Sequence, residues 1–240
     1  MRKDDVRSYH ILVIYSLVAL IILVLDVSGI SGSLLWGTRY AVMLSMPLYS
    51  LKAAVKGKEQ RLLAASLFLI AVGDFFLYVP LASGYENPEL YPWGIIMFSC
   101  AYLMLSAAYL RNAGRDKREL LLALMPMTIF AAGSYGVLSF ADGNLIISSL
   151  LLLFSISFML WNALCVPIRG WYDRTSSKLI LVSAFLMIAC DAGVGLGMMA
   201  GISSEFLFDI GRNIVWSAYI PAWAIILMLS SWRTMGKMKL

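Results

Sequence analysis

The chain has few charged residues and little of the chemistry that most catalytic sites use. Of its 240 residues 14% are charged, one is a histidine (His10), and three are cysteines (Cys100, Cys165 and Cys190). The cysteines lie inside apolar segments, with no CxxC or Cys/His spacing. A disulfide framework and a clustered zinc site are therefore not expected, and we predict neither a bound metal nor a cofactor.

Three common catalytic and binding chemistries also lack their residues. The sequence has no GxSxG motif, and its lone histidine lies near the start of the chain, away from any deep triad. No lysine lies at depth in the interior of an apolar run, where it could form a retinal-type Schiff base. The net charge of +5 comes from basic residues in short blocks between apolar runs, which is typical of membrane topology. We expect no nucleic-acid partner.

Apolar residues dominate the chain instead. They make up 61% of it, and the mean hydropathy is +0.82, outside the range of soluble proteins. Runs of spanning length occupy about residues 10–27, 34–55, 62–81, 91–110, 120–140, 145–168, 179–200 and 208–230. These runs predict an all-α integral membrane protein with eight transmembrane helices. No cleavage motif cleanly follows the first run, so we expect it to be retained and residues 1–240 to form one transmembrane domain.

The basic residues predict the orientation of the helices. If the eight runs alternate in direction, all but two of the 19 Lys and Arg residues lie on one side, and Arg39 and Arg212 lie on the other. The positive-inside rule then places both termini in the cytoplasm. The short loops leave no extramembrane domain, and we expect a multi-pass protein of the bacterial inner membrane.

Two acidic residues lie deep in the interior of apolar runs, where an ionised carboxylate costs at least ~2.5 kcal/mol. Asp74 follows Arg61 by 13 residues, and Asp191 follows Lys178 by 13 residues. At ~1.5 Å per residue, both lie about 20 Å into the layer. Paired buried carboxyl groups are suited to general acid–base catalysis, with one protonated as the acid and the other ionised as the base. The sequence does not assign the two roles.

The chain also aligns with itself. A shift of 117 residues superimposes residues 62–111 on 179–228 without a gap. The shift pairs Asp74 with Asp191, Gly84 with Gly201, Gly94 with Gly211, and Tyr102 with Tyr219. This pattern predicts two four-helix halves, residues 10–110 and 120–230, as parallel repeats about an axis along the membrane normal. The alternative is convergence of two apolar helix pairs.

Other polar residues in or near the runs are candidates for substrate binding. Four of them have side chains that could orient a carboxylate or a water molecule: Tyr78, Tyr102, Asn162 and Tyr219. Each could instead be a packing residue with its hydrogen bonds satisfied.

Arg39 and Arg212 are candidates for the phosphate of a lysophospholipid, because arginine binds phosphate with two parallel hydrogen bonds. The alternative is an interfacial arginine paired with Asp209 or Glu205.

Three stretches, AVGDFFLY, GIIMFSCAYLMLSAAYL and AFLMIACD, resemble the YhhN-like lysoplasmalogenase family of eight-helix membrane proteins. The resemblance implies hydrolysis of the vinyl ether bond of lysoplasmalogens, with a lysophospholipid carrying a phosphoethanolamine or phosphocholine head group as substrate. The products would be a fatty aldehyde and the glycerophospho head group, and Asp74 and Asp191 would be the catalytic pair. Three positions depart from the family pattern: Tyr102 replaces a histidine, Cys190 a serine, and Trp223 a glutamine.

Two other functions stay open from the sequence. Parallel repeats and acidic residues at mid-membrane depth are also typical of small transporters and proton-coupled carriers. A third possibility is a lysolipid-binding relative without catalytic activity, in which Tyr102 marks the loss. The head group and the oligomeric state are not determined by the sequence.

Overall fold

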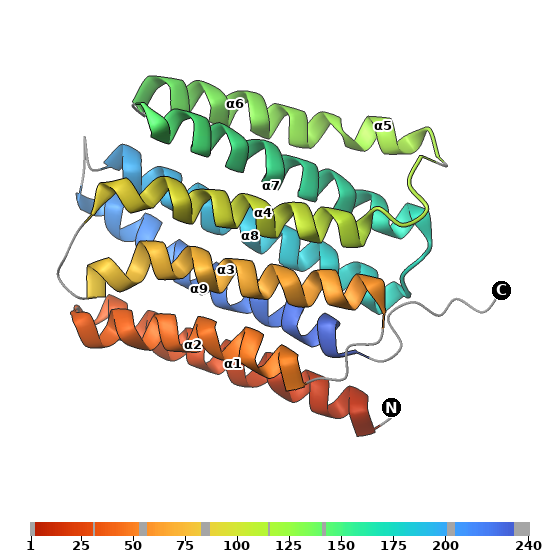
Figure 1. Cartoon of the computed structure of the whole chain (residues 1–240), viewed down its shortest axis with the longest axis horizontal. Helices are drawn as coiled ribbons and strands as arrows, with labels where there is room; N and C mark the ends of the chain where they lie inside the picture. Colours follow the sequence, from red (N-terminus) through yellow and green to blue (C-terminus); the bar gives the residue numbers. More distant parts are fainter. Residues whose placement is uncertain are drawn as a thin grey trace.

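The protein is a bundle of long helices that run nearly parallel to its long axis (Figure 1). The computed structural model describes residues 3–30, 32–52, 57–82, 87–114, 116–140, 143–200 and 205–232. Its helices are α1 (Lys3–Val27), α2 (Ser33–Lys52), α3 (Lys58–Ala82), η1 (Pro88–Leu90), α4 (Tyr91–Tyr109), α5 (Arg118–Leu122), α6 (Leu124–Phe140), α7 (Asn144–Arg169), α8 (Arg174–Ala200) and α9 (Glu205–Ser231). Consecutive long helices run in opposite directions, so α1 begins and α9 ends at the same end of the bundle.

The eight predicted runs coincide with these helices. Within the described ranges, seven helical segments are long and apolar enough to cross a membrane. The remaining predicted span, α2, has 20 residues, but it is less apolar and does not reach that standard. The protein is therefore an integral multi-pass membrane protein.

The fifth predicted run, residues 120–140, is interrupted near its start. It is divided between α5 and α6 at Ala123, whose N–H bonds to the carbonyls of Leu120 and Leu121. Pro126 explains the break, because its ring clashes with the carbonyl four residues earlier and it has no N–H to donate. The two pieces still run as one rod along α7 (Figure 1).

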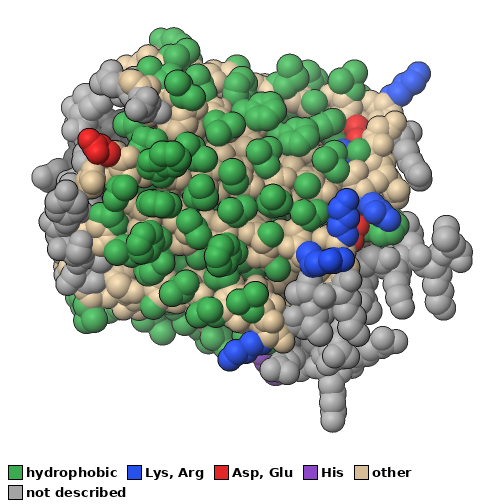
Figure 2. All heavy atoms as spheres, viewed as in Figure 1, with side chains coloured by type: hydrophobic (Ala, Val, Ile, Leu, Met, Phe, Trp, Pro, Cys, Tyr) green, Lys and Arg blue, Asp and Glu red, His purple; other side chains and the backbone are tan. Residues whose placement is uncertain are grey.

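The sides of the bundle are apolar, as contact with lipid chains requires. Large side chains project outward from α1 and α6, including Leu17 (55% exposed), Ile21 (58%) and Leu138 (63%). Figure 2 shows hydrophobic side chains spread over the face, with the visible Lys and Arg toward the end where α1 begins. Such a surface would be unstable in water but is stable in a bilayer.

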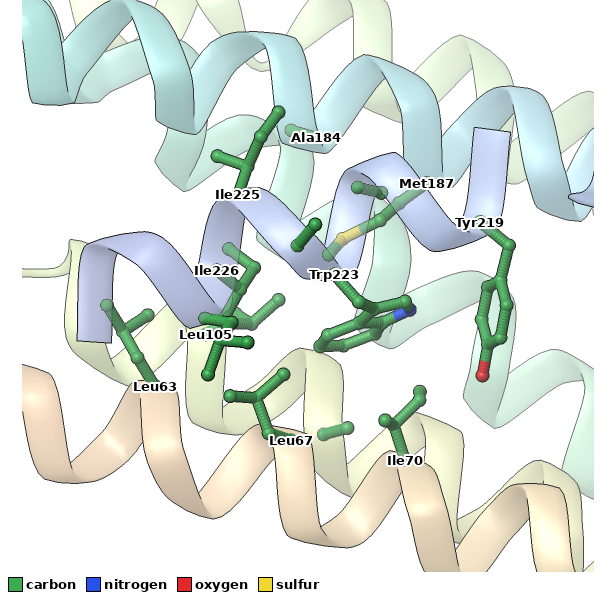
Figure 3. Packing of buried hydrophobic residues seen from close by; sticks show 14 of the residues in the cluster. Leu63, Leu67, Ile70, Leu105, Ala184, Met187, Tyr219, Trp223, Ile225 and Ile226 are labelled. Carbon is green, nitrogen blue, oxygen red and sulfur yellow. The ribbon is translucent and has the colours of Figure 1, made fainter. Parts of the chain in front are cut away.

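Helix α9 lies at the centre of the bundle. It packs against α8, α1, α3 and α2, and 78% of its segment Asn213–Ser231 is buried. Trp223 and Tyr219 extend from α9 toward α3, beside Ile70 (Figure 3). Ser183 of α8 donates a hydrogen bond of 3.0 Å to the Ala222 carbonyl of α9. Groups on α9 are consequently held in fixed positions relative to α3 and α8.

Helices α3 and α4 meet at two glycines. A Cβ at Gly73 would lie 2.6 Å from the Phe98 ring and 3.2 Å from the Gly94 carbonyl oxygen. A Cβ at Gly94 would lie 2.7 Å from Leu77. The backbones approach this closely because neither residue has a side chain. Asp74, the next residue after Gly73, is fixed by this contact.

A buried ion pair ties α4, α5 and α7 together at the end where α1 begins. Arg169 donates to Glu119 at 2.8 Å, and their side chains are 1% and 6% exposed. Arg169 also donates to the Tyr109 carbonyl and to the Asn162 amide oxygen, both at 2.9 Å. The indole of Trp161 donates to the Glu119 carbonyl at 2.8 Å. These contacts fix the position of α5 relative to α4 and α7.

Candidate active site

Asp74 is a carboxyl group removed completely from the surface. It lies in the middle of α3 with 0% of its surface exposed. The hydroxyl group of Tyr219 on α9 lies 2.8 Å from one carboxyl oxygen and 2.9 Å from the other, and donates its hydrogen to them. Tyr219 is itself buried. A group in this position is held rigidly, with a single hydroxyl shared between its two oxygens.

Asp191 is bound in the corresponding way on α8. The hydroxyl group of Tyr102 on α4 donates to its Oδ2 at 3.0 Å. Tyr102 is 1% exposed, whereas Asp191 is partly exposed. Of the two carboxyl groups, Asp191 is thus the more accessible.

The two hydrogen bonds cross between the predicted halves of the chain. Tyr219, from residues 120–230, binds the aspartate of residues 10–110, and Tyr102, from residues 10–110, binds the aspartate of residues 120–230. The Tyr102 hydroxyl and the Cys190 thiol each interact electrostatically with both Asp74 and Asp191. Because Tyr102 and Tyr219 also both contact Trp223, the two aspartate–tyrosine pairs are neighbours.

Aromatic rings enclose these polar groups. Phe98 stacks on Tyr219 with ring centroids 6.1 Å apart, and Tyr102 stacks on Trp223 at 6.2 Å. Trp223 and Tyr219 meet edge to face at 6.4 Å, which joins the two stacks. The rings fix the directions of both hydroxyl groups and surround them with apolar surface. Trp223 is not among the residues that we expected in the site from the sequence.

Arg39 lies buried on α2 against two tryptophans, whose rings meet edge to face with centroids 6.3 Å apart. Its guanidinium group is 4.7 Å from the Trp36 ring centre and 4.6 Å from that of Trp216, and it forms an ion pair with Asp26 of α1. Arg39 and Asp26 are 1% and 5% exposed. Asp26 is thus a partner of Arg39, where the sequence suggested Asp209 or Glu205. The side chains of those two residues lie outside the described residues.

The Arg39 group is connected to the aspartate site through α9. Trp216, which covers one face of the guanidinium, meets Tyr219 edge to face at 5.8 Å. Tyr40, the neighbour of Arg39, interacts electrostatically with Asp74. Two side chains, Trp216 and Tyr219, thus link the cation to the carboxyl group of Asp74.

Other candidates from the sequence are placed differently. Asn162 donates to the Phe158 carbonyl at 2.8 Å and accepts from Arg169, so it belongs to the ion-pair cluster at the end where α1 begins. Tyr78 lies on α3 and Arg212 on α9, but their side chains lie outside the described residues. The aspartate site as described holds Tyr102 and Tyr219 from the predicted set.

Asp26 is the residue whose importance the sequence analysis missed. Its signal was present, because Asp26 and Arg39 are opposite charges inside apolar runs that flank one short loop. Antiparallel neighbouring helices bring such residues to similar depths, and a buried charge requires a partner.

The arrangement is capable of acid–base chemistry. Each of the two carboxyl groups accepts a hydrogen bond from a tyrosine and is enclosed by aromatic rings. Carboxyl groups in such surroundings can donate or accept a proton.

Comparison with known proteins adds one match. The model of the YhhN family matches residues 34–231, which is most of the 240-residue chain and includes Asp74, Asp191, Tyr102 and Tyr219. No curated protein matches the chain, and no solved structure does.

Proposed function

The chain belongs to the YhhN family, and from this premise we propose that it is an ether-lipid hydrolase of the lysoplasmalogenase type. Its substrate would be a lysophospholipid with a vinyl ether chain, and its catalytic pair Asp74 and Asp191. The observation that supports this most strongly is the crossed arrangement in which each aspartate accepts a hydrogen bond from a tyrosine of the other half.

The reaction requires one acid and one base on either side of a vinyl ether. A protonated carboxyl group donates its proton to the outer vinyl carbon, and the ether oxygen shares its electrons to form an oxocarbenium ion. The other carboxylate takes a proton from water as the water oxygen bonds to the cationic carbon. The resulting hemiacetal then breaks its bond to the glycerol oxygen, which receives a proton as the aldehyde forms. One water molecule is consumed, and both carboxyl groups can return to their starting state.

The surroundings suit this sequence of steps. A carboxylate near the oxocarbenium ion stabilises its positive charge, and it does so more strongly where aromatic rings exclude water. Tyr102 and Tyr219 would keep each carboxyl group oriented as its proton leaves or arrives. Because Asp191 is partly exposed and Asp74 is not, water would reach Asp191 more readily, which favours Asp191 as the base.

The topology belongs to the same proposal. Two parallel four-helix repeats would place both aspartates about one central axis, and the crossed hydrogen bonds are what such symmetry would produce. The distribution of Lys and Arg favours cytoplasmic termini. The bacterial inner membrane stays the location that we propose.

The test is release of fatty aldehyde from a lysoplasmalogen by the purified full-length protein in detergent. We expect turnover by the wild type and its collapse in Asp74→Asn and in Asp191→Asn. Asp116→Asn, the same change at an exposed position, should keep the wild-type rate. In D2O, the aldehyde should carry one deuterium on the carbon next to the carbonyl group.

The other functions predict different results. A lysolipid-binding relative would bind the substrate without releasing aldehyde. A carrier would do neither in detergent, but would accumulate a solute in vesicles.

A further inference from the structure

We propose that the indole N–H of Trp223 binds the water molecule that attacks the substrate and holds it beside Asp74 and Asp191. The inference rests on the proposed function and deepens it. In the proposed reaction the aspartates exchange protons and the tyrosines orient the aspartates, which leaves the position of the water to another group.

The indole N–H of Trp223 is a buried donor without an acceptor. Trp223 is 0% exposed, and none of the described residues accepts a hydrogen bond from its Nε1 atom. A buried N–H in this situation destabilises the folded protein, because it gives up the hydrogen bond that it makes with water in the unfolded chain. Such groups are rare in proteins, and a catalytic role is one reason for which they occur.

The indole contacts both of the tyrosines that bind the aspartates. Trp223 follows Tyr219 by four residues on α9, so both project from the same face of the helix. Figure 3 shows the indole nitrogen on the edge of Trp223 that faces Tyr219, whose hydroxyl group donates to Asp74. The face of the indole stacks on Tyr102, which donates to Asp191. A small molecule bound to the N–H would therefore lie beside both aspartate–tyrosine pairs.

The hydrogen-bonding groups of the site match those of water. An indole N–H is a donor only, so its ligand must present a lone pair. Asp74 and Asp191 each receive one hydroxyl hydrogen from a tyrosine, and a carboxylate has about four acceptor positions, so both can also accept from the ligand. Water accepts through its oxygen and donates two hydrogens, and buried waters typically make about three hydrogen bonds.

This arrangement leaves the attacking electron pair free. One lone pair of the water accepts from the Trp223 N–H, and the other is available to bond to the cationic carbon of the oxocarbenium ion. As that bond forms, Asp191 takes a proton from the water, and the indole keeps its own. The same N–H bonded to the ether oxygen would oppose the reaction, because it would withdraw the electrons that this oxygen has to share.

The first test compares two substitutions that remove the same group. Trp232 also has a buried indole nitrogen without an acceptor among the described residues, but it lies beside Tyr9, where α1 begins and α9 ends. In the aldehyde-release assay with the full-length protein, Trp223→Phe should lower kcat about tenfold, the value of one hydrogen bond, and leave KM unchanged. Trp232→Phe should keep kcat within about twofold of the wild type.

A second measurement, by nuclear magnetic resonance, detects the water and requires no turnover. With nitrogen-15 in the tryptophans, the indole signal of Trp223 is the one that Trp223→Phe lacks. We expect its proton to show cross-relaxation with water and a downfield shift, as for an N–H bonded to oxygen. An N–H directed at the Tyr219 ring, which is a weak acceptor, would be shifted upfield.

An isosteric replacement keeps the proposal testable if Trp223→Phe does not fold. Benzothienylalanine at position 223 has the shape of tryptophan and carries sulfur in place of the N–H. It should reproduce the loss in kcat at a melting temperature close to that of the wild type.

Four results would overturn the proposal. They are an unchanged kcat in a folded variant without the N–H, a raised KM with unchanged kcat, an equal fall in kcat in Trp232→Phe, and an upfield Trp223 signal without contact to water. The second result would show that the N–H binds an oxygen of the lipid, and the third that packing explains the loss.

Failure of this proposal and failure of the hydrolase are distinguishable. If the wild type releases aldehyde and the Asp74 and Asp191 variants do not, the hydrolase stands even where Trp223→Phe is fully active. If the wild type releases none, the proposed function fails, and the role of the water in the reaction fails with it, whether or not the Trp223 N–H contacts water.

Discussion

Replacing Tyr219 by phenylalanine should reduce turnover more than the same change at Tyr102. Tyr219→Phe removes a hydroxyl group that lies 2.8 and 2.9 Å from the two oxygens of a fully buried Asp74. Tyr102→Phe removes a single contact of 3.0 Å to an aspartate that is partly exposed and can be solvated in part by water. The two substitutions are chemically identical, so a difference between their effects on turnover reflects the different surroundings of Asp74 and Asp191.

The magnitude follows from the value of a hydrogen bond to a charged group. Such a bond contributes ~1.5–3 kcal/mol, and each ~1.36 kcal/mol corresponds to a factor of ten in rate. We therefore expect Tyr219→Phe to lower kcat by about 10- to 150-fold and Tyr102→Phe to remain toward or below the lower limit. KM should change little in both, because the tyrosines orient catalytic groups rather than the lipid.

The assay is aldehyde release at saturating lysoplasmalogen, with the melting temperature of each variant as the control for folding. A Tyr219→Phe variant that melts normally and turns over within twofold of the wild type would refute the positioning role. A larger loss in Tyr102→Phe would refute the argument from burial.

Two stability predictions follow from other contacts. Gly73→Ala should lower the free energy of unfolding by ~1–3 kcal/mol, because its Cβ would overlap the Phe98 ring. The control is Gly136→Ala, where a Cβ meets nothing within 4 Å. Equal melting temperatures of the two variants would contradict the close α3–α4 contact. Arg169→Met should lower the free energy of unfolding by ~3–5 kcal/mol, because it leaves the Glu119 carboxylate buried and unpaired. Arg118→Met, in an exposed pair, should leave the melting temperature unchanged. Unaltered stability of Arg169→Met would show that the ion-pair cluster does not stabilise α5.

The sequence predicted the helices well because the signal for each one is local. A run of apolar residues of spanning length must form a helix to satisfy its backbone in lipid, and the observed bounds differ from the predicted ones by at most seven residues, at the start of α1. The division of the fifth run at Ala123 was readable from Pro126, but the apolar pattern continues across the break and conceals it.

The aspartates and tyrosines of the candidate site were predictable from the sequence, but their pairing was not. The internal alignment singled out Asp74, Asp191, Tyr102 and Tyr219, because polar residues are few enough in these runs to stand out. That each tyrosine binds the aspartate of the other half depends on how α9 packs against α3, and on how Tyr102 of α4 reaches Asp191 of α8, which no local pattern specifies.

Asn162 illustrates the same limit. From its position in the sixth apolar run, Asn162 could have lain near the aspartates. It lies instead on the face of α7 that carries Arg169 seven residues later, and it accepts a hydrogen bond from that arginine. Residues seven apart share one side of a helix, so the arginine at the helix end was the nearer partner. Which face of α7 met which neighbour was decided by tertiary packing.

The measurement that tests the central claim most directly is a double-mutant comparison of aldehyde release by wild type, Asp74→Asn, Asp191→Asn and the variant with both changes. If the two carboxyl groups act as one acid–base unit, each single change should abolish nearly all turnover, and the double change should be no worse than the poorer single one. Single variants that each keep more than about a tenth of the wild-type rate, ~1.4 kcal/mol or less in activation free energy, with losses that multiply in the double variant, would contradict the account.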